Sequence, residues 1–252
     1  KPAAYAGGNA TIKVSKNGKM DRSIVPISAT TPGPLPANMY DTIDIPDIAS
    51  EIAKWTNYDT VAYAGKIYFL PRASIATVNE SYADSLIAYD TSDGTWSKIR
   101  IPIESLTADG QQIINDVIDL TTCVKDGKLY LWIKGHYTAQ PAGVINVFAS
   151  MDENQNWSTL GYNVMNHNAT LVSDGVNFYL VNGTIMNESF QQIDSNSVLK
   201  LEIAQDDTVK GTEVAKTKNS PQRPRVTYTN GKLVISGGNA SSGMVLPNTV
   251  VE

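Results

Sequence analysis

Thr122-Cys-Val-Lys-Asp-Gly127-Lys-Leu-Tyr-Leu-Trp132 is an apolar strand pattern that turns over on a glycine into a second, aromatic-rich strand. Three similar stretches turn at Gly65, Gly175 and Gly231, so successive turn glycines lie 62, 48 and 56 residues apart. A repeat of about 50 residues that carries several strands is typical of a β-propeller blade. The sequence therefore predicts an all-β fold of repeated antiparallel sheets.

One repeat holds four predicted strands. The strands 60–64 and 66–70 are joined at Gly65, and the strands 85–90 and 96–101 follow after a loop, before Pro102 ends the last one. Equivalent patterns predict one propeller region over residues 1–252 with about four to five blades' worth of sequence. The predicted whole blades are 59–102, 120–162 and 169–215, and the predicted partial blades are 1–28 and 225–252. The strands after the four turn glycines carry residues that are predicted to occupy equivalent blade positions: Tyr68, Tyr130, Tyr179 and Leu233.

Several short motifs resemble a known family. Tyr89 followed by Trp96, and the double glycine Gly237-Gly238, are similar to the motifs of kelch repeats, a fold shared by the central domain of galactose oxidase. The resemblance implies a divergent kelch-like β-propeller, because Lys134-Gly135 and Asn182-Gly183 stand where double glycines are expected. The repeat positions that it implies are structural: Gly65, Tyr89, Trp96, Gly127, Trp157, Gly175, Gly231, Gly237 and Gly238.

Kelch propellers usually hold about six or seven blades, so the predicted ring is short by at least one. An open stack leaves a bare sheet edge, which predicts association with a further fragment of the same protein or with a second copy. Because the chain begins at Lys1, we expect it to be a processed or trimmed piece of a longer protein.

Composition excludes two classes of partner. The 252 residues are 42% hydrophobic and only 18% charged, with a net charge of −5. This balance provides no basic patch for nucleic acid. No apolar run approaches the roughly 20 residues of a membrane span.

The compartment is expected to be extracellular or the cell surface. Cys123 is the only cysteine, and its place in an apolar strand predicts a buried, unreactive side chain. Asn-Xaa-Ser/Thr sequons are abundant, which favours secretion. They occur at Asn9, Asn79, Asn156, Asn168, Asn182, Asn187 and Asn239.

Three segments depart from the strand pattern. Residues 48–55 and 111–119 have apolar side chains at helical spacing, which predicts one or two helical turns in each. The proline-rich stretch 30–36 predicts a stiff extended connection.

The residues do not favour any of three kinds of catalysis: copper radical oxidation, sialidase-like glycan hydrolysis, and acid/base hydrolysis by paired carboxylates. A copper centre like that of galactose oxidase needs two histidines and a tyrosine cross-linked to cysteine; His136, His167 and Cys123 are available, but no tyrosine is marked as the partner of Cys123. The stretch from Ser150 to Trp157 resembles the structural Asp box of sialidases, with Asn154 in the position of the positive-φ glycine. A sialidase also binds the carboxylate of its substrate with three arginines. Arg223 lies two residues before Arg225, but the sequence marks no such triad.

Acid/base hydrolysis by paired carboxylates is the third kind. The groups 41–47, 152–153 and 206–207 lie in turn-like sequence, where aspartate caps backbone N–H groups. Oxygen-bearing side chains alternate over 152–156 as in a calcium loop, but the glycine and the distal glutamate of an EF-hand are missing. The turn interpretation is favoured for all of them.

The sequence thus predicts a non-enzymatic binding module that presents propeller loops to a protein or glycan partner, with no cofactor, catalytic or metal residue and with its ligand-binding residues unknown. The alternative is the propeller of a larger glycan-active or oxidase-type enzyme. A pocket of arginines or histidines favours the enzyme, and loops bearing aromatic residues favour binding. The loops in question are 71–84, 135–143, 184–195 and 239–245.

Overall fold

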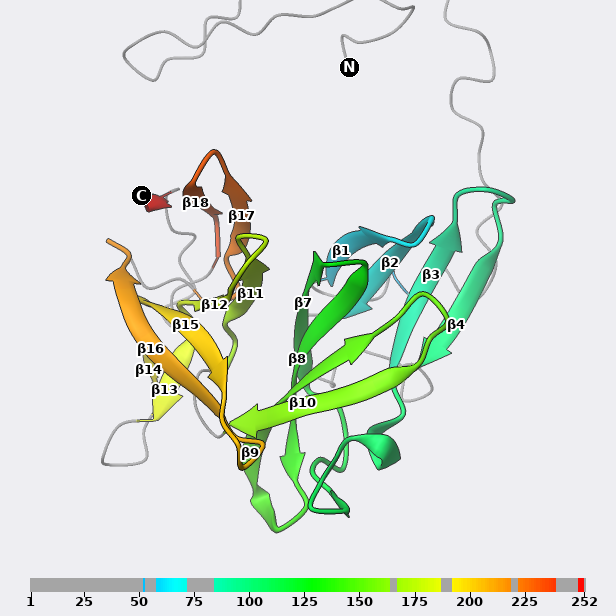
Figure 1. Ribbon diagram of the computed structural model, residues 1–252, viewed down its shortest axis with the longest axis horizontal. Coiled ribbons are helices and arrows are strands. Elements are labelled where there is room, and N and C mark those ends of the chain that lie inside the picture. Colours follow the sequence, from blue (N-terminus) through cyan, green and yellow to red (C-terminus); the bar gives the residue numbers. More distant parts are fainter. Residues whose placement is uncertain are drawn as a thin grey trace, which may run out of the picture. The chain divides into compact units, whose positions relative to one another are not determined.

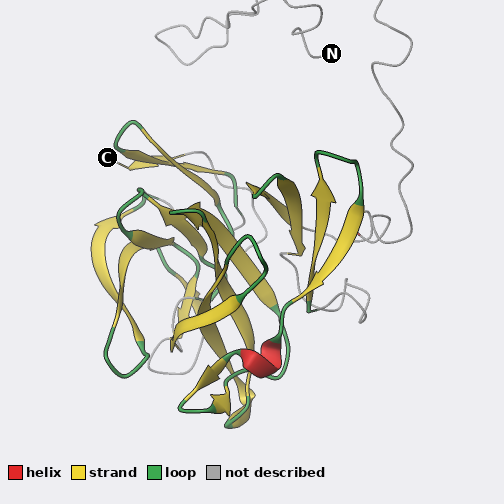
Figure 2. Ribbon diagram, turned by 45° about the vertical axis from the view of Figure 1, so that its right-hand side comes forward, coloured by secondary structure: helices red, strands yellow, loops and turns green. Residues whose placement is uncertain are grey.

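The computed structural model describes residues 52, 58–71, 84–163, 167–186, 192–218, 222–238 and 249–251. The chain divides into two compact units, Lys1–Ile45 and Pro46–Glu252, and every described residue belongs to the second. Figure 2 shows strands throughout this part, with the short 3-10 helix η4 (Ile103–Ser105) in red. The all-β class is confirmed. The segments 1–28, 30–36 and, apart from Ile52, 48–55 lie outside the described residues.

Antiparallel sheets of four strands follow one another along the chain (Figure 1). The first has the order β1-β2-β3-β4, the second β7-β8-β9-β10 and the third β11-β12-β15-β16, while β17-β18-β19 form a three-stranded sheet. The bounds in the first two are β1 (Tyr58–Tyr63), β2 (Lys66–Pro71), β3 (Ser85–Asp90), β4 (Trp96–Arg100), β7 (Asp119–Lys125), β8 (Lys128–Tyr137), β9 (Gln140–Met151) and β10 (Trp157–Asn163). Those in the last two are β11 (Thr170–Ser173), β12 (Phe178–Val181), β15 (Ser197–Ile203), β16 (Val209–Lys216), β17 (Arg225–Thr229), β18 (Lys232–Ser236) and β19 (Thr249–Val251).

Two small hairpins lie between these strands. β5 (Thr107–Ala108) pairs with β6 (Gln111–Gln112), and β13 (Thr184–Met186) pairs with β14 (Gln192–Asp194). The segment 111–119, predicted as helical turns, instead begins with β6 and ends at the start of β7. That prediction was wrong because Asp109-Gly110 closes a hairpin just before the segment, and hairpin pairing replaces the local helical pattern.

The repeated glycines end two-residue turns of one type. Ala64-Gly65, Asp126-Gly127 and Asn230-Gly231 each place two successive residues at positive φ, from 47° to 76°. Positive φ at both central residues is the type I′ geometry, whose twist matches that of the flanking strands. The third repeat differs: Ser173 pairs with Phe178 across a four-residue turn.

Apolar cores lie between consecutive sheets. The first core joins Tyr68 and Leu86 of the first sheet to Leu131 of the second. Phe148, from the opposite face of the second sheet, packs with Leu171 of the third. The third core joins residues of the third sheet to those of the last. The second and third sheets are therefore covered on both faces.

The repeated tyrosines show the direction of this packing. Tyr68, Tyr130 and Tyr179 each lie in or against the core that their own sheet shares with the following one. Leu233, predicted to be their equivalent, lies in the core shared with the preceding sheet. The equivalence was wrong there because neighbouring residues of a strand face opposite sides of the sheet.

The first strands of the sheets lie next to one another. β1 contacts β7, β7 contacts β11, and β11 contacts β17. The backbone N–H of Leu171 in β11 donates to Thr121 Oγ1 of β7 at 3.2 Å. Arg225 at the start of β17 reaches Asp59 of β1, with Nη1 3.0 Å from Oδ1. These contacts bring the starts of distant strands together.

Phe148 tests the packing between the second and third sheets. Its side chain is fully buried, with ring centroids 5.9, 6.0 and 5.2 Å from those of Tyr130, Trp132 and Phe178. We expect Phe148→Ala to lower the free energy of unfolding by about 3–5 kcal/mol, because the cavity removes contacts from both sheets. Urea denaturation measures it. Val176→Ala, at a 77% exposed position, is the control with an expected change below about 0.5 kcal/mol. Equal effects of the two substitutions would contradict the packing.

Candidate functional site

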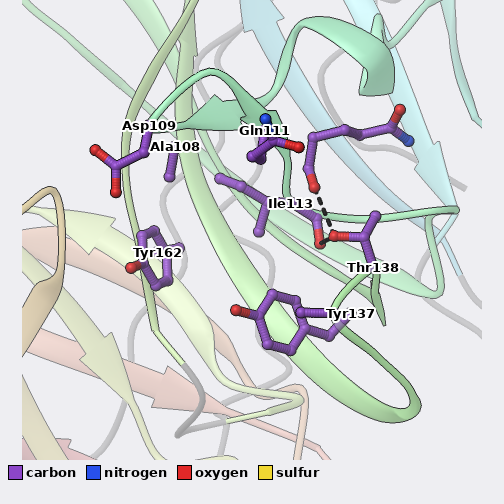
Figure 3. Close-up of a pocket in the computed structure, with 9 residues that line it drawn as sticks. Ala108, Asp109, Gln111, Ile113, Tyr137, Thr138 and Tyr162 are labelled. Atoms are coloured by element: carbon purple, nitrogen blue, oxygen red, sulfur yellow. Dashed lines mark hydrogen bonds between the residues drawn. The ribbon is translucent and has the colours of Figure 1, made fainter.

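A pocket of about 250 Å³ lies where the β5–β6 hairpin meets the end of the β8–β9 hairpin and β10. Figure 3 shows Asp109 and the tyrosines Tyr137 and Tyr162 around it. The full lining is Ala108, Asp109, Gln111, Gln112, Ile113, Tyr137, Thr138, Ala139 and Tyr162. Three separate segments of the chain therefore build one site.

The β5–β6 hairpin fixes one wall. Asp109 and Gly110 have φ of 49° and 73°, the type I′ geometry for which Asp-Gly is a preferred sequence. Gln112 Nε2 donates to the carbonyl of Ile114 at 2.7 Å, which holds that amide in place. The Asp109 carboxylate accepts no hydrogen bond from the described residues, so both of its oxygens remain available.

The β8–β9 hairpin fixes the second wall. The hydroxyl of Thr138 donates to the carbonyls of Gln112 and Ile113, at 2.5 and 3.2 Å, and its N–H donates to Ile113 at 3.0 Å. Gly135 permits this docking, because a Cβ there would lie 2.2 Å from the carbonyl oxygen of Asp116. The predicted loop 135–143 therefore belongs mostly to β8 and β9, and Tyr137, which pairs with Gln140, is held by the sheet and not by a free loop.

Tyr162 forms the third wall. A register shift between Thr159 and Gly161 bends β10, and the N–H of Tyr162 donates to the carbonyl of Asp207 at 2.9 Å. A Cβ at Gly161 would lie 2.5 Å from that same carbonyl oxygen, so only glycine allows the β15–β16 turn to approach. The β15–β16 turn and the register shift in β10 together set the position of the Tyr162 ring.

The chemistry of the pocket is that of a polar, aromatic binding site. Tyr137 and Tyr162 are half-buried against the first core. Within the part of the chain that the structure describes, neither ring stacks on another aromatic and neither hydroxyl has a hydrogen-bond partner. In Figure 3 both hydroxyls and the Asp109 carboxylate are directed toward the same side, away from Thr138. The site thus offers apolar ring surface beside unused donors and acceptors.

A second polar cluster lies at the starts of β7, β11 and β17. Arg223 Nε is 3.0 Å from Oδ2 of the buried Asp119, and Arg223 Nη2 donates to Asn168 Oδ1 at 3.0 Å. Lys134 Nζ reaches the same Asn168 oxygen at 3.4 Å, and its burial lowers the pKa of the ammonium. The adjoining cavity is only about 10 Å³. This cluster holds three strand starts together and leaves room for at most about one water.

The two histidines lie in different surroundings. His136 is paired with Asp116, its Nδ1 2.7 Å from Oδ2. His167 is 1% exposed beside Asn146, and burial, followed by the positive charge of Lys134, lowers its pKa to about 4. Across the described ranges, no group of three or more His, Cys, Asp or Glu residues is placed to hold a metal ion.

Cys123 does have a tyrosine beside it. Tyr130 lies directly opposite Cys123 in the β7–β8 pairing, which the sequence did not mark. The pair packs with Phe178 in the second core, and burial raises the pKa of the thiol to about 12. Cys123 is therefore a protonated, half-buried side chain against the second core, and not the fully buried one that the sequence predicts.

Asp152 and Asp206 of the acidic groups cap turns, and the group 41–47 lies outside the described residues. Asp152 Oδ1 accepts the N–H groups of Asn154 and Asn156, both at 2.9 Å. The side-chain amide of Asn156 also donates to Asp152 Oδ2 at 2.8 Å, and this bond, followed by the backbone bonds, lowers the pKa of the Asp152 carboxyl. Asp206 Oδ1 accepts the N–H of Thr208 at 3.2 Å in the same way. The positive φ of the Asp-box-like turn is at Gln155, 62°, and not at Asn154 as predicted.

The predicted structural positions are spread over the sheets. Tyr89 and Trp96 are cross-strand neighbours with ring centroids 4.9 Å apart, and Trp157 packs against the first core. All the glycines of that set adopt positive φ: Gly65, Gly127, Gly175, Gly231, Gly237 and Gly238. Gly175 has φ of 92° and lies in the longer third turn. None of these positions lines the tyrosine-lined pocket.

Sequence reasoning singled out no residue of this pocket by itself, although Tyr137, Thr138 and Ala139 fall within the predicted loop 135–143. The Asp109-Gly110 dipeptide is a strong turn signal that was available, and it would have predicted the β5–β6 hairpin. Nothing local links Tyr137 to Tyr162, because 24 residues separate them and only the sheet brings them together.

No protein-family model and no curated protein matches the chain. A search of solved structures finds the structure of YjhT, a kelch-like β-propeller-type protein, with a TM-score of 0.53 and 11% sequence identity. The match covers 76% of this chain and 60% of that one, so the chain spans about three fifths of the length of its structural neighbour. The likeness supports the fold and carries nothing about activity. In the described residues we find no helix of the length and apolarity needed to cross a membrane.

His167 predicts a pH dependence of stability. Its pKa of about 4 in the folded chain lies below the ordinary 6.5, so the unfolded chain takes up the proton first as the pH falls. Stability is full above about pH 6.5 and falls as the pH drops toward 4, by up to about 3 kcal/mol. Urea unfolding at pH 7.0, 6.0 and 5.0 measures this loss. We expect His167→Gln to flatten the dependence, and an unaltered slope in His167→Gln contradicts the assignment.

Proposed function

We propose that the chain is a non-enzymatic binding module of an extracellular or cell-surface protein, a divergent kelch-like β-propeller that binds a glycan in the pocket of Tyr137 and Tyr162. The observation that carries the proposal is that pocket: two half-buried tyrosines and polar side chains around about 250 Å³. It is close in size to the small end of ligand pockets, which suits one sugar residue of a longer chain.

Packing and topology support the propeller part of the proposal. Consecutive antiparallel sheets pack face to face, and their first strands lie side by side in chain order. Both features are expected of blades arranged about a common axis. The likeness to YjhT, although the chain spans only part of it, points in the same direction.

The chemistry of a sugar fits the pocket. A pyranose has a face of C–H groups and a rim of hydroxyls, and tyrosine offers the complementary pair of an apolar ring and a polar tip. The Asp109 carboxylate accepts hydrogen bonds from sugar hydroxyls, and the amides of Gln111 and Gln112 add directional contacts. Rigid walls lower the entropic cost of binding, because the two hairpins are already hydrogen-bonded.

The arginines and histidines support binding over the enzyme alternative. Arg223 pairs with Asp119 and Arg225 with Asp59, so each guanidinium is engaged by a different strand. Recognition of an anionic substrate by converging arginines needs guanidinium groups that are not already neutralised. His167 is buried without a facing carboxylate among the described contacts, which suits a core position better than general acid or base work.

The extracellular part rests on the polar composition of the chain. Of the described sequons, only Asn156 is exposed. Asn182 is fully buried and Asn168 accepts hydrogen bonds from Arg223, so neither side chain is available for a glycan. A surface protein without glycans on these asparagines is the form that we propose.

Substitution of the two tyrosines tests the function. We expect the chain to bind members of an immobilised glycan panel, and Tyr137→Ala and Tyr162→Ala each to weaken the best interaction by about tenfold or more, because the stacking surface is lost. Titration calorimetry with that glycan gives the affinities. Tyr228→Ala, at a 38% exposed tyrosine outside the pocket, is the matched control and should bind normally. The absence of glycan binding, or equal binding by all variants, refutes the proposal.

A further inference from the structure

The charge in the tyrosine-lined pocket is of one sign. Asp109 is the only carboxylate among the described lining residues, and no lysine, arginine or histidine lines the pocket. The remaining polar lining consists of amides and hydroxyls. A ligand atom that enters therefore meets a negative field without a compensating cation.

The position of Asp109 is fixed by the backbone. It occupies the first central position of the type I′ turn, and the flanking Ala108 and Gln111 are paired in register. The side chain is exposed at the rim, and no described residue donates to it. Its carboxylate is therefore neither neutralised nor free to leave the pocket by a change of loop conformation.

A second negative turn adjoins the opposite wall. The β15–β16 turn, which positions Tyr162 through the carbonyl of Asp207, carries both Asp206 and Asp207. Lys210 is the cation that acts on this turn, where it contributes to the lowered pKa of Asp206. One lysine against two aspartates leaves the turn with a net negative charge.

We infer that the pocket selects uncharged sugar residues and rejects those that carry a carboxylate or a sulfate. This inference rests on the proposed function and adds the ligand class to it. A neutral sugar offers Asp109 two hydroxyl donors in place of the water it loses. An acidic sugar brings a second anion close to Asp109, and no cation lines the pocket to pair with either. The two anions repel each other, and the cost of removing water from them is not offset.

Asp109→Asn is the variant that tests the selection. Asn-Gly also favours the type I′ turn, so the hairpin is expected to remain folded while the charge is removed. Glu153→Gln removes one exposed carboxylate from a turn outside the pocket and is the matched control. The ligands are pairs of glycans that differ only in whether the terminal residue is neutral or acidic.

The measurement is the ratio of the affinities for the two members of each pair, by titration calorimetry at fixed ionic strength. The wild-type chain and Glu153→Gln should prefer the neutral member by about tenfold or more, and Asp109→Asn should reduce that preference to within about threefold. Wild-type binding of acidic members as tight as that of neutral ones, lost on Tyr162→Ala, overturns the inference and leaves the proposed function standing. An unchanged preference in Asp109→Asn also overturns it. Failure of both kinds of glycan to bind overturns the proposed function itself.

Discussion

The burial of both faces of the β7–β10 sheet is the constraint on which the rest of the structure depends. Leu129, Leu131 and Ile133 pack toward the first sheet, while Trp132 and Phe148 pack toward the third. A sheet that is apolar on both sides cannot remain in water without a neighbour on each side, so its formation requires the two adjacent sheets. The order of the sheets in space then follows their order in the chain.

This packing creates the tyrosine-lined pocket at its margin. β8 and β9 extend beyond the residues that pair with β7 and β10, and their hairpin carries Tyr137 and Thr138 onto the β5–β6 hairpin. Gly135 and Gly161 are the points where backbone approaches backbone too closely for any side chain. The pocket is thus a by-product of two close approaches, and its walls are as rigid as the sheets that carry them.

Polar contacts, and not apolar packing, join the starts of the first strands. Asp119, Asn168 and Arg223 come from segments before or at the start of three successive first strands, and one connected set of hydrogen bonds links them. Gly183 has the same role as Gly135 in this region, because a Cβ there would lie 2.5 Å from the carbonyl oxygen of His167. Gly135 and Gly183 therefore both stand where another segment passes too close to the backbone for a side chain.

The sequence by itself determined the all-β class, the four-stranded antiparallel sheets and the turns at Gly65, Gly127 and Gly231, because strand alternation and positive-φ turns depend on neighbouring residues. It failed at 111–119, where apolar residues at helical spacing are buried by hairpin pairing, and at Leu233, whose side of the sheet depends on register. Only the tertiary structure decided the candidate site. Asp109, Tyr137 and Tyr162 come from separate segments, and their meeting is set by sheet packing and by the close approaches at Gly135 and Gly161, which no local pattern encodes.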